Sequence, residues 1–229
     1  HFQAGNLAKA IESFNKALIL EPNNTDVRVE LARILTYSSS SLTTDQERRD
    51  ALNQALSVID AAKAAEPTNA DVLAMRAFVL SWLSNPALSG DQSEDYRNQA
   101  EAEALAAIQL DSANSLAKAY YAEILIDQYK LVQAQDYIAQ ARSNGEDLMD
   151  VRRIQAYIYE VLGEYNLAIE WYQKAIEVTP NLTFLYIRTG VLYRFLQQYD
   201  TALELFAKAV SLNQQLGIQD PIPYMAIAN

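Results

Sequence analysis

The chain has 229 residues, half of them hydrophobic and 21% charged, which is enough to bury a large core and disfavours global disorder. Its net charge of −11 argues against binding to nucleic acid or to an anionic membrane surface, because both attract basic proteins. It has no cysteine and only six glycines and six prolines, which excludes disulfides and disfavours a many-turned β fold.

One pattern of residues recurs along the whole chain. It consists of an alanine, a bulky residue four positions later and a second alanine three positions after that, and the first copy is Ala10, Phe14 and Ala17, followed by Pro22. The two alanines and the bulky residue between them share one face of a helix, where alanine lets two backbones approach closely. The leading residues of the six copies are Ala10, Ala55, Ala100, Ala134, Ala168 and Ala202, spaced 45, 45, 34, 34 and 34 residues apart.

A second pattern precedes each copy after the first and predicts the partner helix. A small residue is flanked by larger ones, as in Ala32 with Leu35 and Gly190 with Tyr193. The two patterns together predict pairs of antiparallel helices that cross at small residues. Because a single pair cannot bury both of its faces, we expect the pairs to stack into a continuous array.

The 34-residue spacing and these residues resemble the tetratricopeptide repeat. The two stretches most similar to that consensus are Gly163, Tyr165, Ala168, Tyr172, Ala175, Pro180 and Gly190, Tyr193, Tyr199, Ala202, Phe206, Ala209. The resemblance covers nearly the whole chain and implies an all-α fold, a right-handed α-solenoid of stacked helix pairs. The tryptophan position of the family departs from the consensus and holds Arg28, Leu73, Lys118, Arg152 and Tyr186. The alternative is an ordinary helical bundle with coincidental alanines.

We expect a single array that begins and ends inside repeats. Residues 1–24 are the second helix of a truncated repeat, 25–69, 70–114, 115–148, 149–182 and 183–216 are full helix pairs, and 217–229 start a further repeat. The first two pairs carry eleven-residue inserts, around 38–48 and 84–94, at the same turn. Because equivalent turns stack, the inserts should lie side by side on one edge. Thr44 with Glu47 resembles a capping box and predicts a helix over about 45–66.

Catalytic chemistry is not expected in this chain. His1 is the only histidine, and without cysteine the sequence contains no Ser-His, Cys-His or His-ligated metal site. Carboxylates cluster at 101–103 and 146–150, which suggests either acid–base or calcium chemistry or, as we favour, solvated helix faces. We therefore expect a protein that is not an enzyme and has no metal and no cofactor.

The resemblance implies a binding surface instead. In that family the first helices line a concave groove that takes peptides or partner helices, while the ordered lysines and asparagines of its chaperone-binding clamp are absent here. The positions that would face the groove in this chain are Arg33, Tyr37, Met75, Phe78, Trp82, Tyr120, Arg153, Tyr157, Phe184, Ile187, Arg188, Arg194 and Phe195. Aromatic residues, methionine and arginine are typical of interaction surfaces, although the apolar ones are equally suited to the core between helices.

These residues predict a protein–protein interaction scaffold that binds a protein or peptide, with no nucleic acid and no membrane insertion. The alternatives are a regulatory or substrate-recruiting arm of a larger enzyme and a small-molecule sensor, which would need an enclosed pocket. The compartment stays open, with the cytoplasm favoured. Arg153, Arg188 and Arg194 predict that the last two full pairs accept an acidic, partly apolar segment, unless they pair with Asp150 and Glu160 instead.

Overall fold

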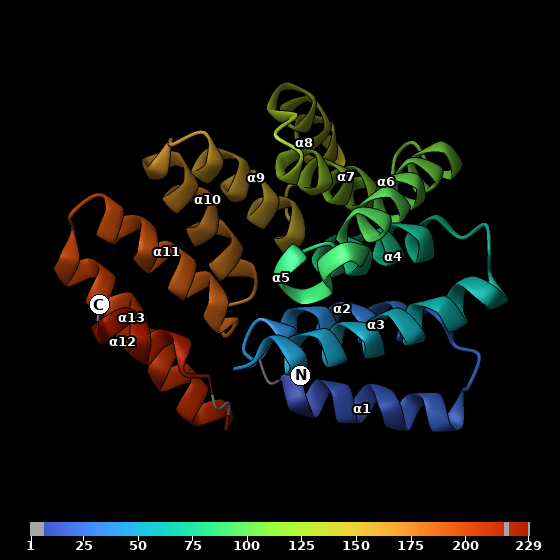
Figure 1. Cartoon of the computed structure of the whole chain (residues 1–229), viewed down its shortest axis with the longest axis horizontal. Helices are drawn as coiled ribbons and strands as arrows, with labels where there is room; N and C mark the ends of the chain where they lie inside the picture. The colour runs from blue at the N-terminus through green and yellow to red at the C-terminus, as the bar shows by residue number, and fades with distance from the viewer. Residues whose placement is uncertain (1–6, 218–219, 229) are drawn as a thin grey trace.

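The computed structural model describes residues 7–217 and 220–228, and in this part of the chain the elements are helices joined by short turns (Figure 1). Helix α1 (Leu7–Leu20) is followed by α2 (Thr25–Ser39) with α3 (Asp45–Ala65), α4 (Ala70–Leu83) with α6 (Ser93–Leu110), α7 (Ser115–Asp127) with α8 (Leu131–Gly145), α9 (Met149–Val161) with α10 (Tyr165–Val178), α11 (Thr183–Phe195) with α12 (Tyr199–Leu216), and α13 (Ile222–Ala228). The two members of each pair pack on one another, and each second helix also contacts the next first helix. The pairs stack into a right-handed superhelix.

The division of the chain into repeat units remains our proposal. Each of the five full units proposed from the sequence contains one of these helix pairs. Among the described residues, 7–24 hold α1 and 220–228 hold α13, which packs on α11 and α12 as a further first helix. Residues 1–6 of the first proposed unit lie outside the described part of the chain.

Asparagine residues cap the N-termini of α2, α4 and α7, the first helices of the first three full pairs. Asn24, Asn69 and Asn114 each accept a hydrogen bond from a backbone N–H of the following turn, at distances between 2.9 and 3.3 Å. This satisfies amide groups that have no partner inside the helix. At the start of α3 the capping box is present, with the Thr44 hydroxyl accepting from the Glu47 amide at 3.2 Å and Glu47 accepting from the Thr44 amide at 2.9 Å.

Small residues lie where the two helices of a pair cross. Ala168 and Ala202 are buried, as the repeat pattern requires. At Gly190 the approach is closer still, since a Cβ there would lie 2.5 Å from the Phe206 ring. Only glycine allows α11 and α12 to come this near at that point.

The two inserts take different forms. The first extends α3 toward its N-terminus, while the second folds into the short helix α5 (Pro86–Ser89) and the 3-10 turn η1 (Gly90–Gln92). Helix α5 contacts α3, and Leu88 is buried in the core, whereas Leu42 is half-buried. The second insert therefore packs on the helix that the first insert lengthens.

The turns inside the last three pairs share one backbone conformation. Tyr129, Gly163 and Gln197, spaced 34 residues apart, have φ angles of 57°, 78° and 60°. In each case the following residue donates its amide to a carbonyl five residues back, at 2.9 Å. This hydrogen-bonding pattern ends a helix with one residue in the left-handed backbone region, which favours glycine. Only Gly163 among the three residues in that region is a glycine.

We predict opposite effects on stability for substitutions at two of these turns. Gln197→Gly should raise the free energy of unfolding by up to about 1 kcal/mol, because it removes the strain of a side chain in the left-handed region. Gly163→Ala should lower it by about 1–2 kcal/mol, since no atom lies near the added Cβ and only the backbone strain remains. Urea unfolding followed by circular dichroism measures both, and equal midpoints for the two variants would contradict the prediction.

We also predict that Ala168→Leu or Ala202→Leu destabilises the array by about 1–3 kcal/mol, because the added volume has no space at a buried helix crossing. Ala139→Leu, at an exposed position on α8, is the control and should leave the denaturation midpoint nearly unchanged. A neutral effect of both crossing substitutions would contradict the assigned packing.

Candidate functional site

The first helices α2, α4, α7, α9 and α11 line the concave face, and the sequence-predicted binding residues on them fall into three groups by their exposure. Six of these residues are buried in the structure. The buried residues are Tyr37, Met75, Phe78, Tyr120, Arg153 and Ile187. Those with partial exposure are Arg33, Trp82, Tyr157, Phe184 and Arg194, and the two exposed residues are Arg188 and Phe195.

Aromatic rings fill the middle of the concave face. Tyr37 on α2 lies 5.4 Å from the ring of Phe78 and 5.8 Å from that of Trp82, both on α4. Its other neighbour is Phe184 on α11, stacked at 5.5 Å between ring centroids. Phe78 stacks in turn on Tyr120 of α7 at 4.5 Å. The first full pair therefore contacts the fifth across the superhelix, and each ring pair adds about 0.5–1.5 kcal/mol beyond its burial.

A buried ion pair lies beside these rings. The two Nη atoms of Arg153 donate to the two carboxylate oxygens of Glu123 at 2.7 and 2.6 Å, and both side chains are at least nine-tenths buried. Burial alone would lower the pKa of Arg153, but the facing Glu123 carboxylate raises it above its ordinary value. The guanidinium therefore stays charged and bound in a two-pronged geometry.

Tyr37 joins this ion pair to a second carboxylate. Its hydroxyl donates to buried Asp150 on α9 and accepts from Nε of Arg153 at 3.2 Å. Burial raises the pKa of the Tyr37 hydroxyl well above its ordinary value, so it remains a donor. Arg33 adds a longer contact to Asp150 at 4.0 Å. We call Tyr37, Glu123, Asp150 and Arg153 the central cluster.

The central cluster was only partly foreseeable from the sequence. The sequence predicts Asp150 on a solvated helix face, but in the structure it is 3% exposed and accepts a hydrogen bond from Tyr37. The family resemblance places Arg153 in the groove, with Asp150 as its alternative partner, but in the structure Arg153 forms its ion pair with Glu123. Glu123, a glutamate among the buried residues of α7, is the signal that the sequence offers for this ion pair.

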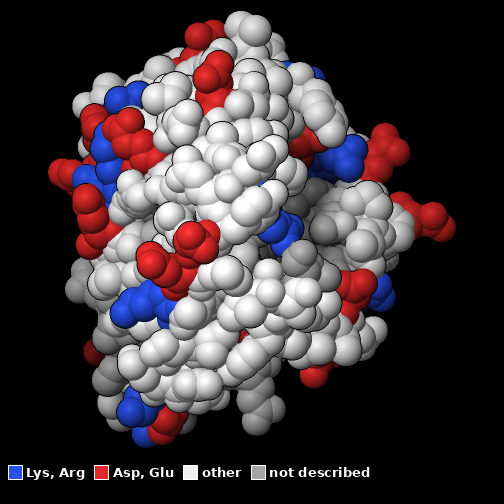
Figure 2. All heavy atoms as spheres, turned by 90° about the vertical axis from the view of Figure 1, so that its left-hand side faces the viewer, with Lys and Arg blue, Asp and Glu red and all other residues white. Residues whose placement is uncertain are grey.

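The C-terminal part of the concave face stays open to solvent. Arg188 lies over the Tyr157 ring at 5.6 Å and pairs with Glu160 at 3.3 Å, and its side chain is 45% exposed. Phe195 at the end of α11 is 62% exposed and stacks on Tyr165 at 5.6 Å. Figure 2 shows that uncharged atoms cover much of the side of the molecule where α11 and α12 lie, with acidic and basic groups along its margins and near its middle.

The described residues, 7–217 and 220–228, contain no helix that is long and apolar enough to cross a membrane. In the same part of the chain, no three acidic or histidine side chains come together in a way that would hold a metal ion.

We predict that breaking the buried ion pair costs more than removing it. Arg153→Met leaves the Glu123 carboxylate buried without its partner, which should lower the free energy of unfolding by about 3–5 kcal/mol. Adding Glu123→Leu to that variant should restore most of the loss, because an apolar pair replaces the ion pair. Urea denaturation of the single and double variants tests this, and a double variant no more stable than Arg153→Met would contradict it.

Two buried tyrosines provide a matched pair of substitutions. Tyr37→Phe removes the donor to Asp150 and should cost about 1–3 kcal/mol. Tyr120→Phe should be neutral or slightly stabilising, because the Tyr120 hydroxyl has no hydrogen-bond partner among the described residues. Thermal melting of both variants side by side is the measurement, and an equal loss in both would show that the hydroxyl contacts are misassigned.

Comparison with known proteins agrees with this geometry. The sequence profile of the tetratricopeptide repeat matches residues 154–182 and 185–216. These ranges contain most of α9 and α11 and the whole of α10 and α12.

Solved structures share the fold over most of the chain. TTC0263, a tetratricopeptide repeat protein of Thermus thermophilus, is 19% identical with a TM-score of 0.61, over 81% of this chain and 90% of that one. YrrB, described as having an unusual peptide-binding site, is 16% identical with a TM-score of 0.52, over 96% and 100% of the chains. Human IFIT1, solved as a dimer with m7Gppp-AAAA, is 17% identical with a TM-score of 0.67, over 95% of this chain and 50% of that one.

Proposed function

We propose that this chain, which is a tetratricopeptide repeat protein, binds a protein partner on the C-terminal part of its concave face. Tetratricopeptide repeat arrays are in general scaffolds for protein–protein interaction and are typically not enzymes. The peptide-binding site named for YrrB is a property of that protein, and it encourages a search for a peptide surface here.

The observation that carries the proposal is the exposure of arginine beside aromatic rings on α9 and α11. Arg188 over Tyr157 and Phe195 over Tyr165 remain accessible, while the central cluster fills the middle of the face. An extended segment cannot pass through that middle without displacing buried charges. We therefore restrict the proposed surface to Tyr157, Arg188, Arg194 and Phe195.

The chemistry of this surface favours an acidic, partly apolar segment. The Arg188 guanidinium pairs with Glu160 at 3.3 Å, and its 45% exposed side chain leaves donors that suit a further carboxylate. Arg194 forms no ion pair with any residue in the described part of the chain. The exposed Phe195 ring offers an apolar anchor. The same surface would serve if the array were a recruiting arm of a larger enzyme.

Charge reversal at the two arginines tests this surface. A photo-crosslinking amino acid in place of Phe195 captures the partner, and the same label in place of exposed Val132 reports background. With the captured partner, Arg188→Glu and Arg194→Glu together should weaken binding by about tenfold or more and reduce its salt dependence.

The control carries the same change in charge elsewhere. Lys16→Glu and Lys208→Glu alter exposed lysines on the second helices α1 and α12. This variant should bind with nearly unchanged affinity. If both double variants weaken binding alike, net charge and not the proposed surface governs the interaction.

A further inference from the structure

The inner wall of first helices has one break, between the fourth and the fifth pair. Helices α2 and α4, α4 and α7, and α7 and α9 pack directly on one another. Helices α9 and α11, which both lie wholly within the described ranges, do not pack along one another, and α10 lies between them (Figure 1). The fifth pair is therefore attached to the fourth mainly through the joint between α10 and α11.

Single side chains connect α11 to the helices on its two sides. Arg188 reaches across the space to α9, where it pairs with Glu160 at 3.3 Å and lies over the Tyr157 ring at 5.6 Å. On the other side, Phe184 in the first turn of α11 stacks on Tyr37 of α2, with ring centroids 5.5 Å apart and ring planes 11° from parallel. In the described part of the chain, α2 and α11 do not otherwise pack along one another.

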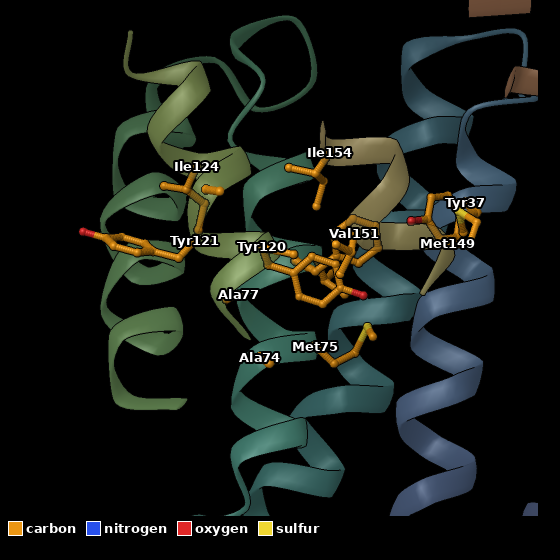
Figure 3. Packing of buried hydrophobic residues seen from close by; sticks show 14 of the residues in the cluster. Tyr37, Ala74, Met75, Ala77, Tyr120, Tyr121, Ile124, Met149, Val151 and Ile154 are labelled. Carbon is orange, nitrogen blue, oxygen red and sulfur yellow. The ribbon is translucent and has the colours of Figure 1, made fainter. Parts of the chain in front are cut away.

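Tyr37 is a fixed anchor for this stack. Its side chain is buried, and its hydroxyl donates to Asp150 and accepts from Nε of Arg153 at 3.2 Å. Figure 3 shows Tyr37 beside Met149, the first residue of α9. Phe184 is only half-buried and takes no part in these hydrogen bonds. The Phe184 ring can therefore move away while the hydrogen bonds of the central cluster stay in place.

The fifth pair also has a small apolar core of its own, which Ile222 of α13 packs against. This core consists of Tyr186, Ile187, Ala209 and Leu212. It is separate from the continuous core of the array, to which α11 contributes Leu185 and Leu192. A unit that has its own core and is joined to its neighbour mainly at one place can turn as a rigid body.

An electrostatic contact also crosses the superhelix. Burial raises the pKa of Asp220, which precedes α13, and the positive charge of Arg48 on α3 counteracts that rise. Asp220 is buried and Arg48 is half-buried, so salt screens this attraction less than one between exposed groups. The attraction favours the same arrangement as the stack, with the fifth pair close to the first.

We infer that the fifth pair and α13 form a movable arm, and that the stack of Phe184 on Tyr37 is the latch that holds this arm closed against α2. Loss of the stack lets the arm turn about the joint between α10 and α11, away from α2. The binding surface proposed above spans α9 and α11, so its shape changes when the arm turns. A partner on that surface favours one position of the arm over the other, and this last step alone rests on the proposed function.

Spin labels on the whole chain measure the position of the arm, because a sequence without cysteine allows labels at chosen residues only. Asp50→Cys on α3 with Lys208→Cys on α12 reports the distance from the first full pair to the arm. Asp50→Cys with Asp136→Cys on α8 reports a distance that does not involve the arm. All three residues are exposed, and double electron–electron resonance gives both distance distributions.

Phe184→Ala tests the latch. We expect the distance from α3 to α12 to gain a longer component, with the ratio of open to closed molecules raised about fivefold to tenfold, because the stack stabilises only the closed arm. The distance from α3 to α8 should stay as it is in the unsubstituted chain. Phe184→Tyr, which keeps the ring, should keep the closed distance.

Tyr137→Ala is the matched control. It removes another half-buried ring, which contacts Tyr121 at 4.7 Å within the third full pair, and it should leave both distances unchanged. An arm distance that Phe184→Ala does not alter overturns the latch, and so does an equal opening in Tyr137→Ala. A shift of both distances in Phe184→Ala overturns the arm as a rigid unit. Because no partner is present in these measurements, failure here and failure of the proposed function are distinguishable.

Discussion

The buried contact of Arg153 and Tyr37 with Glu123 and Asp150 is the interaction on which the shape of the concave face depends. In a solenoid each repeat ordinarily contacts only its neighbours, so stability adds up locally along the array. Here side chains of α2, α7, α9 and α11 meet across the superhelix. The cluster therefore couples the first full pair to the fourth and fifth. A partner that opened the middle of the face would have to expose the carboxylates of Glu123 and Asp150 and the guanidinium of Arg153, which are all buried.

This closure divides the concave face into two regions of opposite character. The C-terminal region presents Arg188 and Phe195, while the N-terminal region presents the exposed Asp26 and Asp71 in the first turns of α2 and α4. The electrostatic field of each region is screened over about 8–10 Å in physiological salt, so it acts mainly on charges close to that region.

The helices and their crossings were predictable because they rest on local rules. The alanine spacing predicted the helix pairs, and Thr44 with Glu47 predicted that a helix begins at Asp45, as it does. These features depend on residues three or four positions apart, whose geometry a helix determines. The left-handed turns at Tyr129 and Gln197 were not predicted, because their residues lack the glycine that marks Gly163. They form nonetheless because the packing of the flanking helices outweighs the backbone strain.

By itself the sequence determined the all-α solenoid and the helix pairing, since both follow from periodicity along the chain, while the family resemblance implied which first-helix positions would face the groove. Only the tertiary structure decided which inward positions remain available to a partner. Phe78 and Phe195 both occupy groove positions, yet the first is fully buried and the second 62% exposed. The difference arises from the curvature of the superhelix, which brings residues more than a hundred positions apart into contact, as with Tyr37 and Asp150. Curvature is the sum of small rotations between neighbouring pairs, and no single residue pattern encodes that sum.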